Sequence, residues 1–299
     1  MLDFRLKVFQ SVAHNLSFTK ASNELFISQP AVTKHIKELE AEFDVKLFNR
    51  IGSKIALTEA GTILFSYSDQ IMTLHNEAKF EIGKLKGNFE GNLRLGASST
   101  IAQYLIPSVL AKFYERYPEI KLSLINGNTE FIEQQLLKND IDFGIVEGKP
   151  TNTDIRYSPF INDELLVFAS AQNTNIPPKV THEEFVKLPF VLRERGSGTL
   201  EIIEKSLQNY KISPKSLNVS MFLGSTEAIK SFVKSSNGVG IVSRFAIEQE
   251  LTNDVFKLIN TPNLKFYRQF YFISPQGPEP TGLTKLFLNF VQKHYNLSL

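Results

Sequence analysis

The first sixty residues place apolar side chains at helical spacing. Residues 2–12 carry apolar side chains on one face, and residues 17–25, with Ser17 or Thr19 as the N-cap, form a second short amphipathic segment. A third helix is predicted from Ser28, its N-cap, to about residue 42, with its buried stripe three and four residues apart. Residues 45–49 and 54–57 then predict a hairpin or wing.

A different pattern begins at residue 58. Apolar residues recur every three or four positions as a single seam: Leu64, Tyr67, Ile71, Leu74, Ala78, Ile82 and Leu85. This spacing predicts one long helix that resembles a coiled-coil strand. The simple alternative is a helix that packs only on its own domain. We favour self-association, because a helix of this length with a single apolar seam usually has a partner helix.

From residue 92 onward, short apolar strands alternate with helices. Strands are predicted at 92–96, 120–125, 143–146, 165–169, 190–192, around 219, at 240–242 and at 266–273. Helices are predicted at 101–117, 129–138, 199–209, 226–234 and 281–295. This order is typical of an α/β domain with right-handed crossovers, and the strand at 165–169 opens a second α/β lobe.

Composition restricts the function classes. The chain of 299 residues suggests about two domains, and its net charge of +2 means that any nucleic-acid affinity must come from local charge. There is no cysteine, which excludes disulfides, thiolate catalysis and thiol redox sensing. The N-terminal residues lack a continuous apolar signal region, and no apolar run reaches the roughly 18 to 20 residues of a membrane helix. We therefore expect a cytoplasmic protein without a membrane partner.

The second and third predicted helices form a helix-turn-helix, whose second helix enters the major groove of DNA. Gln29 can pair with adenine, and Thr33 can contact a thymine methyl group or a phosphate. Lys34 can reach guanine or phosphate, and Lys37 is expected to contact phosphate. Further candidate contacts are Lys20, Ser28, Pro30, Arg50, Ser53 and Lys54. Residues 1–57 hold eight Lys and Arg against six Asp and Glu, but the acids at 38–44 lie past the proposed face. By spacing alone, two ordinary core helices remain an equal alternative.

Residues 9–61 resemble the N-terminal domain of LysR-type transcriptional regulators. The matching residues are Phe9, Ser17, Phe18, Thr19, Ala21, Ser22, Leu25, Ser28 to Thr33, Ile36, Leu39, Glu40, Leu47, Phe48, Arg50 and Leu57 to Gly61. The wing departs from the family pattern, because it has only two basic residues, Arg50 and Lys54. Phosphate contacts from the wing are therefore expected to be weaker.

The resemblance implies a multidomain α+β protein. Residues 1–57 would form a winged helix-turn-helix, residues 58–90 a dimerisation helix, and residues 91–299 a two-lobed effector domain like a periplasmic binding protein. Lobe I would comprise 91–161 and 266–299, and lobe II 162–265, with crossings near Ile161 and Lys265. The implied partners are double-stranded promoter DNA, a small effector and a second copy of the chain, in a homodimer or homotetramer.

Two loops that join a strand to a helix are candidate effector sites. Ser98, Ser99 and Thr100 bring three hydroxyls to a helix N-terminus, which suits an anion, whereas simple N-capping would need only one of them. The stretch from Arg193 to Thr199 has glycines that allow close backbone approach, and we favour Ser197 and Thr199 over its arginines, of which Arg195 is the candidate clamp. Weaker candidates at strand ends are Asn128, Thr129, Glu147, Ser225, Thr226 and Ser243.

The sequence predicts no catalytic, metal or cofactor site. Gly-x-Ser-x-Gly, His-Glu-x-x-His and a clustered carboxylate pair are all missing, and the five histidines are scattered. The prediction is therefore a DNA-binding regulator that a small, anionic effector controls. The rival hypotheses are a cytoplasmic small-molecule-binding protein and an enzyme that uses the same cleft.

Overall fold

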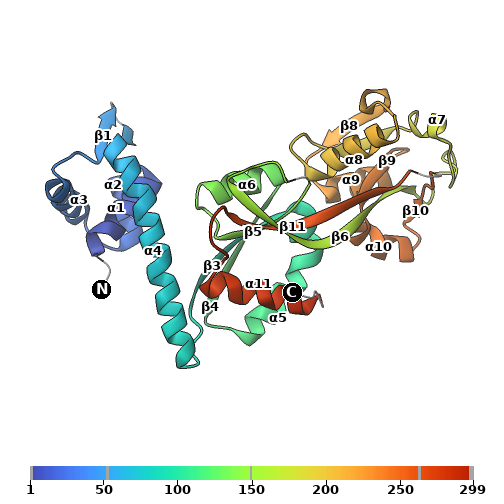
Figure 1. Ribbon diagram of the computed structural model, residues 1–299. Helices are drawn as coiled ribbons and strands as arrows, with labels where there is room; N and C mark the ends of the chain where they lie inside the picture. Colours follow the sequence, from blue (N-terminus) through green and yellow to red (C-terminus); the bar gives the residue numbers. More distant parts are fainter. Residues whose placement is uncertain (1–2, 52–53, 149, 262–263, 296–299) are drawn as a thin grey trace. The chain divides into compact units, whose positions relative to one another are not determined.

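The protein divides into a helical unit, Met1–Asn88, and a mixed α/β unit, Phe89–Leu299. The computed structural model in Figure 1 describes residues 3–51, 54–148, 150–261 and 264–295, and of Arg50 and Ile51 only the backbone. Each unit is described by itself.

The N-terminal unit begins with three helices and a hairpin: α1 (Phe4–Asn15), α2 (Phe18–Leu25), α3 (Gln29–Phe43), β1 (Phe48–Ile51) and β2 (Lys54–Leu57). Ser17 and Ser28 are the N-caps of α2 and α3, and their hydroxyls accept hydrogen bonds from Lys20 N at 3.2 Å and Ala31 N at 3.3 Å. The turn between the two helices passes through Phe26 with a φ of 55°. Strands β1 and β2 pair antiparallel and form the wing.

Helix α4 (Glu59–Leu85) packs on the helical core through its first turns. There Leu64 and Phe65 join the helical core, and Gln10 donates a hydrogen bond to Asp69 at 2.9 Å. Further along the seam the apolar side chains are exposed: Tyr67 by 61%, Ile71 by 42%, Leu74 by 64%, Ile82 by 59% and Leu85 by 87%. Packing within the domain therefore accounts for only a small part of this seam.

The C-terminal unit is built on one mixed sheet with the strand order β4-β3-β5-β11-β6-β9-β7-β8, and β10 pairs with β6. The strands are β3 (Gly91–Ser98), β4 (Ile120–Gly127), β5 (Phe143–Glu147), β6 (Ile155–Ser170), β7 (Phe190–Arg193), β8 (Val219–Leu223), β9 (Val239–Ser243), β10 (Phe256–Leu258) and β11 (Phe266–Pro275). The helices are η1 (Ile101–Leu105), α5 (Ile106–Arg116), α6 (Thr129–Leu137), α7 (His182–Phe185), α8 (Gly198–Asn209), η2 (Pro214–Ser216), α9 (Thr226–Lys234), α10 (Arg244–Thr252) and α11 (Gly282–His294).

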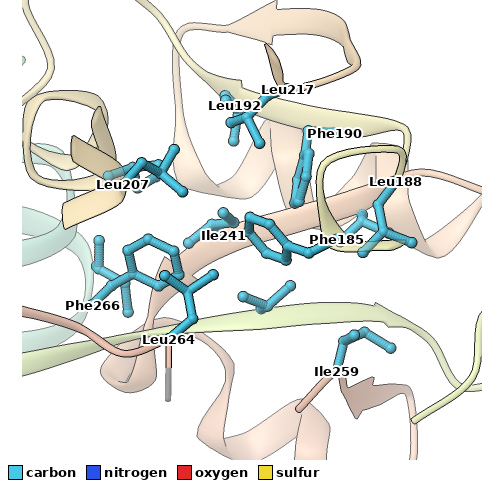
Figure 2. Packing of buried hydrophobic residues seen from close by; sticks show 14 of the residues in the cluster. Phe185, Leu188, Phe190, Leu192, Leu207, Leu217, Ile241, Ile259, Leu264 and Phe266 are labelled. Atoms are coloured by element: carbon cyan, nitrogen blue, oxygen red, sulfur yellow. The ribbon is translucent and has the colours of Figure 1, made fainter. Parts of the chain in front are cut away.

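Two lobes share this sheet. In lobe I, β3, β4 and β5 run parallel, and in lobe II β7, β8 and β9 do so, while the long antiparallel strands β6 and β11 connect the lobes. Figure 2 shows the apolar cluster of lobe II, which includes Phe185, Phe190 and Phe266. Phe270 instead packs in lobe I. The chain therefore changes lobe along β11, between Phe266 and Phe270, close to the expected crossing near Lys265.

Several elements differ from the sequence prediction. The helix expected over 101–117 is divided, and its first five residues form the π-helical turn η1. Pro107 explains the change, since it has no N–H to bond the carbonyl of Gln103 and disrupts regular α-helical winding there. Strand β6 is much longer than the predicted 165–169, and α7, α10 and β10 were not predicted.

Candidate functional site

The outer face of α3 is a candidate nucleic-acid interface. Val32, Ile36 and Leu39 are buried, so the opposite face of the helix points outward. A shallow groove on this face is lined by Gln29, Pro30, Thr33, Lys34, Lys37, Glu38 and Ala41. Most of the predicted major-groove contacts therefore share one surface.

The acidic residues at 38–44 were expected to lie past the DNA-binding face, but one of them lies on it. Glu38 lines the groove and lies 3.9 Å from Lys34, so it reduces the local positive charge. Glu40 instead pairs with Lys46 at 2.7 Å, and Glu42 with Arg5 at 2.8 Å. The predicted backbone contacts Lys20 and Lys54 are exposed. Ser53 and the side chain of Arg50 lie outside the described residues.

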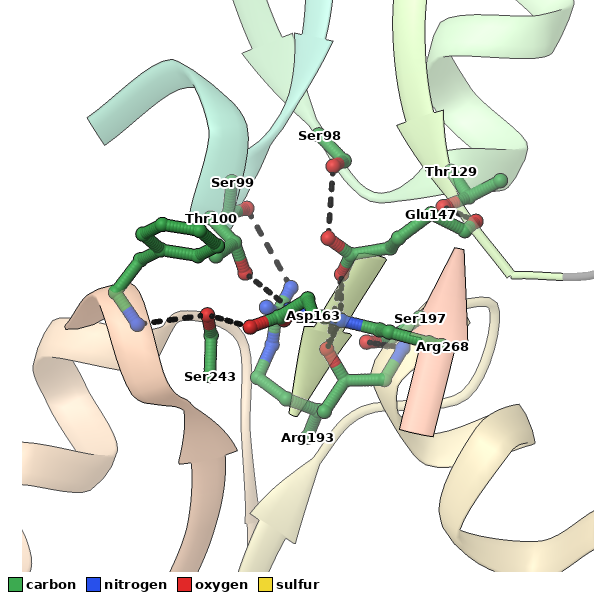
Figure 3. A network of polar contacts seen from close by, with 12 residues as sticks. Ser98, Ser99, Thr100, Thr129, Glu147, Asp163, Arg193, Ser197, Ser243 and Arg268 are labelled. Atoms are coloured by element: carbon green, nitrogen blue, oxygen red, sulfur yellow. Dashed lines mark hydrogen bonds and ion pairs between the residues drawn. The ribbon is translucent and has the colours of Figure 1, made fainter. Parts of the chain in front are cut away.

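In the C-terminal unit, the carboxyl ends of the parallel strands of both lobes meet in a buried polar cluster (Figure 3). Lobe I contributes Ser98 from β3, Glu147 from β5, and Ser99 and Thr100, which directly follow β3, all less than a tenth exposed. Lobe II contributes residues that are equally buried: Arg193, Ser197, Thr199 and Ser243. This is where open α/β sheets bind their ligands.

Glu147 holds the two lobes together. Its carboxylate is 2% exposed and accepts hydrogen bonds from Ser98 Oγ at 2.9 Å in lobe I and from Thr199 Oγ1 at 2.9 Å in lobe II. Gly198 makes this possible, because a Cβ there would lie 2.4 Å from the backbone oxygen of Glu147. This glycine therefore allows the close approach of one lobe to the other.

Arg268, on the crossing strand β11, lies at the centre of the cluster. Its Nε donates to Asp163 at 2.7 Å and its Nη1 lies 3.1 Å from Glu147. Its remaining donors reach Thr199 Oγ1 at 2.8 Å and Thr100 Oγ1 at 3.4 Å. All three nitrogens of this guanidinium therefore have partners within the protein.

The two buried carboxylates have pKa values shifted in opposite directions. Burial alone would raise the pKa of Glu147, but the charges of Arg268 and Arg193, with two hydroxyl hydrogen bonds, outweigh it and hold this pKa below its ordinary value. Burial raises the pKa of Asp163 despite its contact with Arg268. Glu147 is therefore the carboxylate that the cluster stabilises in its charged form.

Several predicted effector residues serve as helix caps or internal braces in this structure. Asn128 caps α6 and Ser225 caps α9, whereas Thr129 donates to the backbone oxygen of Glu147 at 2.8 Å. Ser243 caps α10 and also donates to Asp163 at 2.9 Å. Ser197 caps α8, and Thr226 is buried at the start of α9.

The hydroxyls of the first loop point into the cluster and do not cap the following helix. No side-chain hydrogen bond caps η1, even though Ser98, Ser99 and Thr100 immediately precede it. Ser98 bonds Glu147, and Ser99 donates to the Gly127 carbonyl at 3.1 Å. Simple capping therefore does not explain why three hydroxyls stand here.

Of the two arginines near the end of β7, Arg193 and not Arg195 belongs to the cluster. Arg193 is 1% exposed and pairs with Glu194 at 2.9 Å, whereas Arg195 is exposed. Sequence reasoning missed Arg193, Arg268 and Asp163 as site residues. A usable signal existed for Arg268 only, because a single charge inside an apolar strand implies a buried partner.

A second contact joins the lobes outside the cluster. The Tyr104 hydroxyl in η1 donates to Glu227 on α9, and burial together with this bond raises the pKa of Tyr104. Lys230 lies over the Tyr104 ring and pairs with Glu227 at 2.8 Å and with Glu250 at 2.6 Å. Within the described ranges, no group of three or more His, Asp or Glu side chains is arranged to hold a metal ion.

A helix-turn-helix with an exposed polar face, together with a two-lobed domain around a buried polar cluster, defines a DNA-binding regulator of the ligand-controlled class. Family models agree with this division. Residues 4–62 match the bacterial regulatory helix-turn-helix protein of the lysR family, and residues 86–296 match the LysR substrate binding domain.

Known regulators are similar over almost the whole chain. The HTH-type transcriptional regulator CysL of Bacillus subtilis is 30% identical over 295 residues, 98% of each chain. The HTH-type transcriptional activator CmpR of Synechocystis sp. is 32% identical over 291 residues, which cover 97% of this chain and 94% of CmpR.

Solved structures share the fold. The regulatory domain of Synechocystis CcmR, in complex with 2-PG, is 25% identical with a TM-score of 0.61, over 69% of this chain and 97% of that domain. Full-length CbnR, complexed with its target DNA, is 19% identical with a TM-score of 0.63, over 98% of this chain and 99% of CbnR.

The chain belongs to the LysR family of transcriptional regulators. It is a regulator with an effector-binding domain and not an enzyme, which confirms the predicted class and fold. Among the residues that the structure describes, no helix combines the length and apolar character needed to cross a membrane.

Proposed function

We propose that residues 1–57 bind double-stranded promoter DNA with α3 in the major groove. Gln29 and Lys34 contact base edges, Thr33 contacts a thymine methyl group or a phosphate, and Lys37 contacts phosphate. The observation that carries the proposal is the groove along the outer face of α3, where these four side chains lie together. Flanking contacts come from Lys20, Ser28, Pro30, Arg50, Ser53 and Lys54.

The proposed regulation places a small anionic effector between the lobes of residues 91–299. The buried Arg193 and several hydroxyls from both lobes support this, as does the 2-PG in the regulatory domain of CcmR. The effector would bind one arrangement of the lobes more tightly and thereby shift the population of DNA-binding states. A coupling free energy of about 1 to 3 kcal/mol would be sufficient.

Residues 58–90 are proposed to pair two subunits, in a homodimer or a homotetramer. The exposed seam of α4 supports this, because Tyr67, Leu74 and Ile82 are each more than half exposed. A regulator that binds promoter DNA would act in the cytoplasm.

Two substitutions on α3 test the DNA-binding proposal. Gln29→Ala should cost about 1 to 3 kcal/mol on the preferred site and relax sequence preference at one position, because a base contact is lost. Lys37→Ala should weaken all sequences alike and reduce the salt slope by about one, because a phosphate contact is lost. Fluorescence anisotropy with duplexes selected by the wild-type protein, and with scrambled duplexes, measures both effects.

The matched control is Lys86→Ala, which removes an exposed lysine next to the end of α4. It should leave specificity and salt slope unchanged. Equal loss on selected and scrambled duplexes for Gln29→Ala would refute base reading by this residue. No DNA binding by the wild-type protein at low salt would refute the proposed function.

A further inference from the structure

One charged donor in the polar cluster has no partner. Arg193 uses its Nε and Nη2 for Glu194, at 2.9 Å and 3.0 Å, and Nη2 also lies 3.4 Å from Ser99 Oγ. Its Nη1 is buried and bonds none of the described residues. In contrast, Arg268 bonds through all three of its nitrogens. The polar cluster therefore has one charged donor group available.

An unpaired guanidinium nitrogen at this depth is costly. A buried donor without an acceptor loses its hydration without compensation, and the loss is greater for a charged group. The described residues contain two other buried polar atoms without partners, on Asn173 and Gln292, and neither side chain is charged. Arg193 is thus the position where an external anion would contribute most.

The helix that starts at Ile101 directs further positive potential to the same place. It continues from η1 into α5 and ends at Arg116, so it is long enough to have a substantial dipole. Its N-terminus lacks a side-chain cap, which leaves backbone N–H groups available to an anion. Arg193 reaches Ser99, the residue just before the N-cap Thr100, as Figure 3 shows. The helix start and the guanidinium therefore converge from the two lobes.

We propose that Arg193 is the anion-binding residue of the interlobe site, and that the ligand presents one compact oxyanion group, a carboxylate, sulfate or phosphate, to its Nη1. This inference rests on the proposed effector-binding function. The ligand carries a single such group, because Arg268 is already neutralised by Glu147 and Asp163. A second anionic group would have to face these two carboxylates.

Anion titrations of the full-length chain test the assignment. The probes are sodium sulfate, sodium phosphate and sodium acetate, with ionic strength held constant by sodium chloride. At least one should raise the melting temperature of the wild-type protein. Arg193→Met should weaken binding of that anion about tenfold or more in calorimetric titration, because a charge-assisted hydrogen bond is lost. The probe that binds also identifies the chemistry of the group.

Arg195→Met is the matched control, since Arg195 lies in the same loop, carries the same charge and is exposed. It should keep the wild-type response. The proposal is overturned if none of the three anions stabilises the wild-type protein, if Arg193→Met keeps the response, or if both variants lose it equally.

Glu194→Gln is a third variant, which should bind the anion more tightly than the wild-type protein. A misfolded protein would not show tighter binding. The substitution removes the carboxylate that competes for Arg193, so the same anion should bind more tightly and give a larger thermal shift. Unchanged or weaker binding would contradict the proposal. DNA binding without anion is measured in parallel. If the wild-type protein binds DNA but substitution of Arg193 does not change anion binding, only this inference is refuted. If the wild-type protein does not bind DNA, the proposed function is refuted.

Discussion

At the scale of single residues, Glu147 carries much of the contact between the lobes. A carboxylate buried to this degree is costly unless charges and hydrogen bonds compensate it. Here Arg268 and hydroxyls from both lobes do so. The lowered pKa of Glu147 expresses the resulting stabilisation of the charged form.

Glu147→Gln should lower the free energy of unfolding of the C-terminal unit by about 3 kcal/mol at neutral pH, because Arg268 loses one of its two charged partners. The pKa of Glu147 is lower in the folded chain than its ordinary value of 4.5. The ionised carboxylate therefore stabilises the fold above that value, and the stabilisation is lost as the pH falls through the folded-state pKa. The difference between wild type and variant should thus shrink below pH 4.5. Urea denaturation at a series of pH values measures it.

The wild-type curve alone does not isolate this effect. Asp163 has a raised pKa, so its ionised form weakens the fold and acidification relieves that cost. The difference in unfolding free energy between wild type and Glu147→Gln, plotted against pH, separates the contribution of Glu147. Glu115→Gln, which removes an exposed carboxylate from α5, should change stability by less than about 0.5 kcal/mol. A difference for Glu147→Gln that stays constant with pH would contradict the assignment.

The residues of the polar cluster could be predicted from sequence only in part. Ser98 and Ser243 stand at strand ends next to helices, and Thr199 lies in the first turn of α8, so local sequence signals polar groups at these three positions. Arg268 and Asp163 lie inside long strands, and their meeting depends on the register of β6 against β11. Nothing local encodes that register. The choice between Arg193 and Arg195 likewise depended on where β7 ends.

At the scale of elements, helices with a clear apolar stripe were predicted well, because burial on one face follows directly from their spacing. Helix α10 was missed, since it follows β9 without a turn signal and buries only Ala246 and Ile247. The first half of β6 was missed because Arg156, Ser158 and Pro159 interrupt its apolar pattern. Pairing with β11 holds this segment as a strand despite its composition.

The exposed apolar seam of α4 is predicted to be the interface between two subunits. Leu74→Glu combined with Ile82→Glu should weaken self-association by at least about 3 kcal/mol, because each buried apolar side chain contributes roughly 1.5 to 3 kcal/mol. That is more than about a hundredfold in the dimer dissociation constant. Light scattering coupled to size-exclusion chromatography measures the change. Asn76→Glu, on the other side of the helix, is the control and should leave the assembly intact. A double variant that stays dimeric would exclude the seam as the interface.

At the scale of the whole molecule, the low net charge of residues 1–57, here called the DNA-binding head, suggests that strong DNA binding needs two heads, one from each subunit of a dimer. Residues 1–57 exceed neutrality by only two positive charges, eight basic against six acidic residues, and Glu38 lies in the groove itself. Phosphate contacts supply most of the affinity of a DNA-binding domain. One head should therefore bind weakly, and useful affinity should come from two heads on one duplex.

The prediction is a large difference between duplexes with one and with two half-sites. Linking two binding events makes the second intramolecular, which raises affinity about 10² to 10⁴-fold without any new contact. Wild-type protein should show this ratio in fluorescence anisotropy with a selected duplex and with the same duplex carrying one scrambled half. The variant with Leu74→Glu and Ile82→Glu should bind both duplexes equally weakly, because it presents single heads. If wild-type protein binds both duplexes with the same affinity, each head is sufficient alone, and the pairing of heads by α4 contributes nothing to DNA recognition.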